Sequence, residues 1–117
     1  MKLLTTIFVF LGVFWTTSIF AHDDVSLLSS SPKHNAMLMH SPDELSLQFS
    51  QSVRLVKVSL KSIDGETIQF GFEPSGNVKT NYQWKLPKLK PATYQVMWTI
   101  LGDDGHAMNS KIGFMVH

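Results

Sequence analysis

The chain of 117 residues contains no cysteine. This absence excludes disulfide bonds, thiolate zinc sites, iron–sulfur clusters and cysteine nucleophiles. Charged residues are also scarce, at 16%, and a formal net charge of +1 does not suit a protein that binds the phosphates of nucleic acid. Hydrophobic residues, at 44%, are too plentiful for a disordered chain. We therefore expect one folded domain that is held together by its hydrophobic core.

The first 21 residues have the pattern of a secretory signal peptide. Lys2 precedes an apolar run that ends at Phe20, and the small residue Ala21 stands directly before a polar segment that starts at His22. An uncleaved membrane anchor is the alternative, but the polar residues 16–18 interrupt the run. We expect a signal peptide of residues 1–21 and an exported domain of residues 22–117 that has no membrane span.

The rest of the chain consists of short segments that alternate apolar and polar residues, as β-strands with one buried face do. The alternation is clear at residues 45–50, 56–60, 94–100 and 112–116, and turn residues such as Asp64 and Gly65 separate the segments. No segment after residue 21 has the periodicity of an amphipathic helix. About seven short strands in one domain predict an all-β fold, a Greek-key β-sandwich or barrel of the immunoglobulin-like kind.

Histidine and methionine are the strongest metal ligands in this chain. As the first residue of the exported domain, His22 would offer its α-amine and its Nδ1 atom to one metal as a chelate. Asp104 and His106 lie two residues apart in a turn, so both side chains can point the same way. A nitrogen-rich set with one carboxylate suits Cu(II). Two ordinary explanations stay open, because a histidine in a glycine-containing loop is usually solvated and residues 103–105, Asp-Asp-Gly, are a typical turn sequence.

The other histidines and the methionines can be explained without a metal site. Met37, Met39 and His40 form a cluster whose thioethers would favour Cu(I), but packing in the core or exposure at the surface explains them more simply. Met108 lies two residues beyond His106, without a spacing that argues for metal binding. We expect two surface histidines and three core aromatic residues: His34 and His117, and Trp84, Tyr94 and Trp98.

Several segments of the exported domain, taken in order, form a specific combination. They are LSSSP at 28–32, Asn35-Ala36, SPDELSLQFS at 41–50, PATYQVMW at 91–98, DGH at 104–106 and GFMV at 113–116, after the terminal His22. This combination resembles the CopC family of periplasmic copper-binding proteins, which includes PcoC and YobA-like members. The resemblance implies a Greek-key β-barrel or sandwich that binds Cu(II) through His22, Asp104 and His106.

The sequence departs from the family pattern at a few positions. Gln51 stands where some members have a glutamate, so a carboxylate ligand is lost there. Some members hold Cu(I) in a methionine-rich loop in mid-chain, whereas residues 61–72 of this chain contain no methionine. Ala92 and Ser110 stand where the family has glycine, which affects backbone geometry only.

The resemblance implies a non-enzymatic carrier or buffer of copper in the periplasm, which serves copper homeostasis or resistance. We expect a monomer that binds one Cu(II) per chain and that has a CopD-like inner-membrane protein as a possible partner. Two other functions stay open: a copper-dependent oxidative enzyme that uses His22 as a terminal brace, and an interaction domain without metal. The enzyme is less favoured, because Asp104 would occupy a coordination position and so short a chain leaves little room to bind a substrate.

Overall fold

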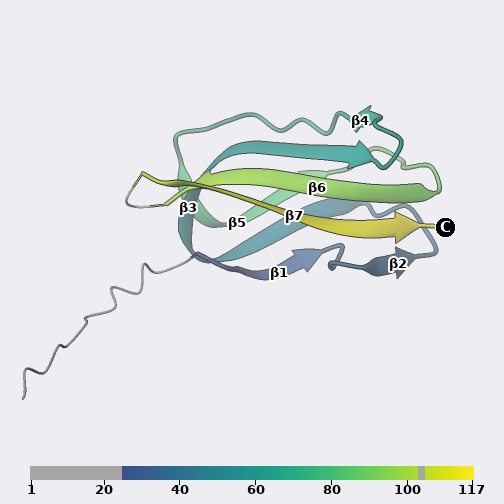
Figure 1. The fold of residues 1–117 in the computed structure, drawn as a ribbon, viewed down its shortest axis with the longest axis horizontal. Coiled ribbons are helices and arrows are strands. Elements are labelled where there is room, and N and C mark those ends of the chain that lie inside the picture. The colour runs from purple at the N-terminus through teal and green to yellow at the C-terminus, as the bar shows by residue number, and fades with distance from the viewer. Residues whose placement is uncertain (1–24, 103–104) are drawn as a thin grey trace, which may run out of the picture.

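The structure, a computed structural model, describes residues 25–102 and 105–117, which form one curled sheet without any helix (Figure 1). Within these ranges there is accordingly no helix that is long and apolar enough to cross a membrane. The all-β prediction is confirmed. The seven strands are β1 (Leu27–Ser31), β2 (Ala36–Leu38), β3 (Glu44–Ser62), β4 (Thr67–Ile68), β5 (Val78–Lys85), β6 (Ala92–Leu101) and β7 (Ala107–Val116).

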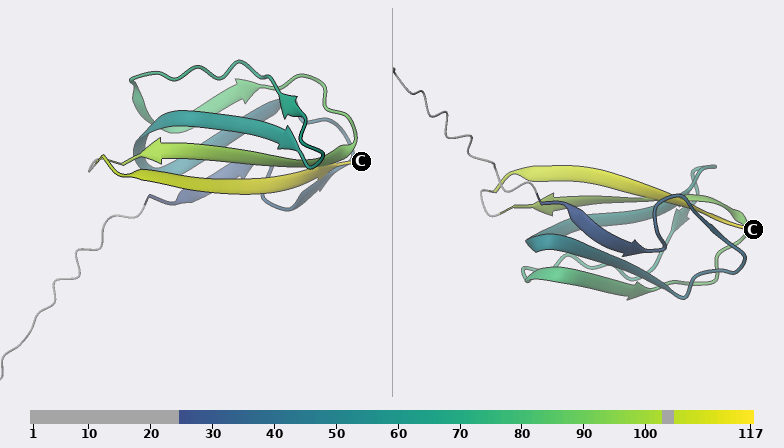
Figure 2. Two further views of the ribbon diagram at one scale, coloured as in Figure 1. Left: turned by 45° about the horizontal axis from the view of Figure 1, so that its top comes forward. Right: turned by 90° about the horizontal axis from the view of Figure 1, so that it is seen from below.

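The long strand β3 connects the two layers of the molecule. Its first half pairs with β1 on one side and with most of β5 on the other. Its second half pairs with β6 and with the short strand β4. The pairing register shifts between Gln48 and Val53 and again between Leu55 and Lys57. Such irregularities bend and twist a strand, and the sheet folds over onto itself (Figure 2). The sequence predicted two separate strands at 45–50 and 56–60, and these are one continuous strand.

The rest of the sheet extends from the second half of β3 through β6 and β7 to β2. β6 and β7 form an antiparallel hairpin that is paired along its whole length, from Leu101 and Ala107 at the turn to Ala92 and Val116 at the open end. β2 runs parallel to β7, with Met37 opposite Met115. The hairpin turn therefore lies at one end of the molecule, and β2 and the C-terminus lie toward the other (Figure 1).

The hydrophobic core lies between the two layers and contains the alternating apolar residues of β3, β6 and β7. Tyr94 and Trp98 are buried in it, as predicted, and the Tyr94 ring stacks on Phe114 at a centroid distance of 5.6 Å. Trp84 is half-buried against the core and stacks on Tyr82. The buried apolar residues are Leu45, Leu47, Phe49, Val53, Leu55, Val58, Leu60, Leu89, Tyr94, Val96, Trp98, Ile100, Ile112, Phe114 and Val116.

Candidate metal centre

His106 is the one predicted metal ligand that lies within the described residues; His22 and Asp104 lie outside them. Its side chain is exposed in the turn between β6 and β7. The backbone N–H of Gly102 donates to the carbonyl oxygen of His106 at 3.1 Å, and the N–H of Gly105 donates to that of Gly102 at 3.0 Å. Gly105 has a φ of 78°, a conformation that glycine adopts without steric cost. These bonds fix the backbone of His106 at the end of the hairpin.

A cavity of about 250 Å³ lies beside this turn and brings the start of the described chain close to β7. Val25 and Leu27 line it from the N-terminal side, and Met108 lines it from β7. Met108 is half-buried and packs against the core, so its side chain helps to fill this end of the barrel. His106 stands two residues before Met108, and Val25 stands three residues after His22.

Two hydrogen bonds hold the segment before β1 beside this cavity. The N–H of Ser26 donates to Oγ of Ser50 at 2.9 Å, and the N–H of Ser50 donates to the carbonyl oxygen of Ser26 at 2.8 Å. The segment before β1 is therefore tied to β3 at the end of the barrel where the β6–β7 hairpin turns. In the right-hand view of Figure 2, β1 begins beside that turn.

Residues 25–102 and 105–117 contain no group of three histidine, cysteine, aspartate or glutamate side chains that could hold a metal ion. The predicted donor set takes two of its three residues, His22 and Asp104, from outside these ranges. The exposed imidazole of His106 fits such a set chemically, because imidazole nitrogen is a good ligand for copper.

The other histidines of the described residues are exposed at the surface, and so are Met37 and Met39. Met37 and Met39 are 72% and 73% exposed, so of the two simple explanations for them, exposure at the surface is the correct one. His34 is exposed, as predicted, but its Nδ1 accepts a hydrogen bond from the N–H of Gly113 at 3.0 Å. The proton of a neutral His34 ring therefore sits on Nε2. This role was not visible in the sequence, because it depends on the approach of two distant segments. His40 and His117 are exposed.

Comparison with known proteins gives one family and several solved structures. The family model of the CopC domain matches residues 27–117. The structure of CopC from Methylosinus trichosporium OB3b matches with a TM-score of 0.66 and 23% identity, over 79% of this chain and 92% of that one. The structure of PcoC, a methionine-rich copper resistance protein from Escherichia coli, matches with a TM-score of 0.66 and 19% identity, over 80% of this chain and 98% of that one. No curated protein sequence matches.

Proposed function

Because the chain belongs to the CopC family, we propose that it is an exported protein that binds one Cu(II) at the end of the barrel where the β6–β7 hairpin turns. The proposed ligands are His22, Asp104 and His106. Two similar folds belong to proteins described as CopC and as a copper resistance protein, which supports copper as the metal. The role that we propose is that of a carrier or buffer of copper, without enzymatic activity.

The proposed ligands form a set that favours Cu(II) over other common metal ions. The α-amine and Nδ1 of His22 bind as one chelate, so the second bond forms without the entropic cost of recruiting another ligand. The imidazole of His106 adds a further nitrogen, and the carboxylate of Asp104 neutralises part of the charge of the ion. Cu(II) lies at the top of the affinity order of divalent ions for nitrogen and oxygen sites.

The observation that carries the proposal is the shared cavity of Val25 and Met108. A chain of three residues spans at most about 11 Å, so the Cα atom of His22 can lie no farther than that from the Cα atom of Val25. Two residues of strand span about 7 Å, which is the distance along the chain between Met108 and His106. The N-terminal histidine and the turn are thus within reach of one metal ion, although they are far apart in the sequence.

We further propose that residues 1–21 are a signal peptide and that residues 22–117 act in the periplasm as a monomer. A CopD-like membrane protein is the proposed recipient of the copper. A copper-dependent oxidative enzyme is the alternative, and the two functions differ in a simple measurement. Mixed with a reductant, the copper form of an oxidative enzyme keeps consuming oxygen and producing hydrogen peroxide, whereas that of a carrier should consume little more than the copper-free protein does.

Mass spectrometry of the exported protein, with and without one equivalent of Cu(II), tests the proposal directly. We expect the mass of residues 22–117 without Cu(II) and the addition of one copper atom with it. The variant His106→Ala should retain far less copper under the same conditions. His117→Ala is the matched control, because it removes an exposed histidine from the C-terminus and should bind copper as the unchanged protein does. Equal copper loss from both variants would contradict the proposed ligand set.

A further inference from the structure

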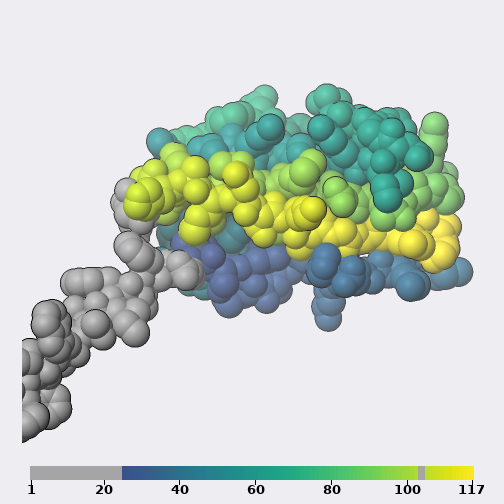
Figure 3. Space-filling view, in the orientation of Figure 1, coloured from purple at the N-terminus to yellow at the C-terminus, as the bar shows by residue number. Residues whose placement is uncertain are grey.

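One side of the layer formed by the second half of β3, β6 and β7 is turned away from the core. We call it the outer face and define it by the row Ser59, Met97 and Lys111, which are neighbours in register across the three strands. None of these three residues is buried. Figures 1 and 2 show no described segment that crosses this face, and Figure 3 looks directly onto it. The outer face is therefore an open sheet surface.

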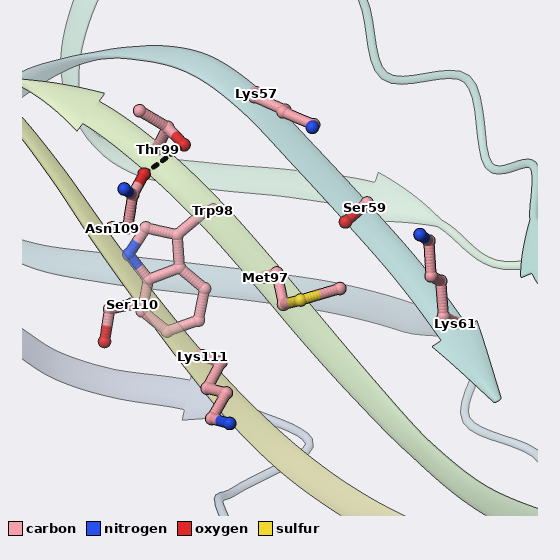
Figure 4. Close-up of a pocket in the computed structure, with 9 residues that line it drawn as sticks. All are labelled: Lys57, Ser59, Lys61, Met97, Trp98, Thr99, Asn109, Ser110 and Lys111. Atoms are coloured by element: carbon pink, nitrogen blue, oxygen red, sulfur yellow. Dashed lines mark hydrogen bonds between the residues drawn. The ribbon is translucent and has the colours of Figure 1, made fainter. Parts of the chain in front are cut away.

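The outer face contains two adjoining hollows. The first hollow has a volume of about 540 Å³ and is lined by Lys57 and Lys61 of β3 and by Lys111 of β7. Met97 of β6, the strand between β3 and β7, also lines it (Figure 4). The second hollow, of about 440 Å³, continues toward β2. Its lining includes Met37 and Met115, which are paired across β2 and β7. Lys111 lines both hollows, so they adjoin, and we call the two together the depression.

The charged residues that line this depression all carry the same sign. Lys57, Lys61 and Lys111 are exposed, and neither hollow is lined by an aspartate or a glutamate. Lys57 and Lys61 are four residues apart along a strand, a span of about 13 Å, and Lys111 lies two strands away, at about 10 Å. A polypeptide segment that carries several carboxylates can contact all three ammonium groups along this row.

The floor of the depression is apolar and adaptable. Met97 and Met115 are half-buried, and Met37 is 72% exposed. Methionine is enriched at protein–protein interfaces, because its flexible and polarizable side chain adjusts to different partners. Thr99 donates a hydrogen bond from Oγ1 to Oδ1 of Asn109 at 2.6 Å, which leaves the Asn109 amide group as a donor at the edge of the first hollow.

We infer that the outer face is a docking surface for a partner protein that presents a segment of acidic and apolar side chains. The carboxylates would meet the three lysines, and the apolar side chains would cover the methionines. Electrostatic complementarity of this kind accelerates encounter and selects the partner. The inference goes beyond the copper-binding function and does not depend on it, because none of these residues is a proposed copper ligand.

Fluorescence anisotropy with a short labelled peptide rich in Glu and Leu tests the inference, with the same peptide carrying Gln for Glu as the uncharged probe. We expect binding of the acidic peptide that weakens as salt is added and no binding of the uncharged one. The variant Lys57→Gln with Lys61→Gln and Lys111→Gln should bind about tenfold or more weakly, a change of about 1.4 kcal/mol or more. The matched control replaces three exposed lysines outside the outer face: Lys79→Gln, Lys85→Gln and Lys88→Gln.

Methyl NMR spectra of the methionines locate the bound peptide. The ε-methyl signals of Met37, Met97 and Met115 should shift on titration, and that of Met108 should stay in place. Three results would overturn the inference: equal loss of affinity in both triple-lysine proteins, complete displacement of the peptide by inorganic phosphate, or binding to vesicles of anionic lipid without binding to the peptide. Methyl shifts that depend on protein concentration without any peptide would also overturn it, because a second copy of the chain would then occupy the face.

Discussion

Val25 and Met108 line the same cavity, although one precedes the first strand and the other belongs to the last. They share this cavity because β1 pairs with the first half of β3, while β7 belongs to the layer that the second half of β3 enters. The fold thus brings Val25, which precedes the first strand, beside the start of β7, which directly follows the turn that contains His106. A metal site at this end would link the N-terminal segment to the β6–β7 hairpin, so copper binding would stabilise the folded state.

The first prediction concerns the free α-amine of His22. A protein with one extra residue before His22 loses the amine as a ligand, because its nitrogen becomes part of a peptide bond. We expect most of the Cu(II) affinity to disappear, while the circular dichroism of the β-sheet stays the same. Competition with a Cu(II) chelator measures the affinity. Equal affinity of the extended and the authentic protein would show that the amine is not a ligand.

The second prediction compares Asp104 with His106. His106→Ala removes a nitrogen ligand, whereas Asp104→Asn retains the shape of the side chain and an oxygen that can still bind weakly. The histidine variant should therefore lose more Cu(II) affinity than the aspartate variant. Both proteins should remain folded, because His106 is exposed in a turn and loops tolerate change. An unchanged Cu(II) electron paramagnetic resonance spectrum in His106→Ala would rule out this ligand.

The strands were predictable from the sequence wherever one face is buried. Tyr94 and Trp98 lie on the buried side of β6 because the apolar positions of that segment alternate with polar ones. The continuity of β3 was not predictable, because the pairing register shifts between Leu55 and Lys57 and the buried positions change there from odd to even residue numbers. The parallel pairing of Met37 with Met115 was also not predictable, because a short strand carries no signal about its distant partner.

The residues of the candidate site were likewise predicted from local sequence patterns. The sequence did not show which distant segments the fold brings together. The exposed position of His106 follows from the turn residues around it, whereas the roles of His22 and Asp104 stay predictions. The outer face was also not predictable from the sequence, because it depends on the pairing of distant strands. Lys57 and Lys61 alternate visibly with buried residues in β3, but only the register of β6 and β7 brings Lys111 to the same hollow.

The third prediction is that the protein has no strong Cu(I) site. Cu(I) prefers sulfur ligands, and Met37 and Met39 are exposed at the edge of the sheet rather than gathered around a protected pocket. A competing Cu(I) chelator should remove nearly all of the Cu(I) from the protein. Strong retention of Cu(I) that is lost in Met37→Leu with Met39→Leu would contradict this expectation; Met97→Leu is the matched control.

The fourth prediction concerns stability at alkaline pH. Burial raises the pKa of the Tyr94 phenol above its ordinary value of 10.0, and the carboxylate of Glu66 adds to the rise. The folded state therefore holds this proton more tightly than the unfolded state. The resulting stability is complete below pH 10 and is lost as the pH rises through the pKa of the folded state.

Urea unfolding between pH 8 and pH 11 measures this effect. The free energy of unfolding should fall less steeply with pH in Tyr94→Phe than in the unchanged protein. At pH 8 the variant should be less stable by about 1 kcal/mol, because the hydrogen bond from the Tyr94 hydroxyl to the carbonyl oxygen of Lys90 is lost. Tyr82→Phe is the matched control. Parallel pH curves for the unchanged protein and Tyr94→Phe would contradict the role of Tyr94.

The last prediction joins copper binding to folding. Cu(II) must displace the proton of the His22 α-amine, a group whose ordinary pKa is about 7.7–8.0, so binding releases protons and weakens as the pH falls. Free Cu(II) at about 100 times Kd stabilises the folded state by about 2.7 kcal/mol. Calorimetry should therefore show a Tm that Cu(II) raises by about 10 °C or more at pH 7.5, and by much less at pH 5. The copper-free protein should be folded at both pH values, because apolar side chains form the core of the residues that the structure describes. A Tm that Cu(II) leaves unchanged at pH 7.5 would favour a β-sandwich that binds no metal.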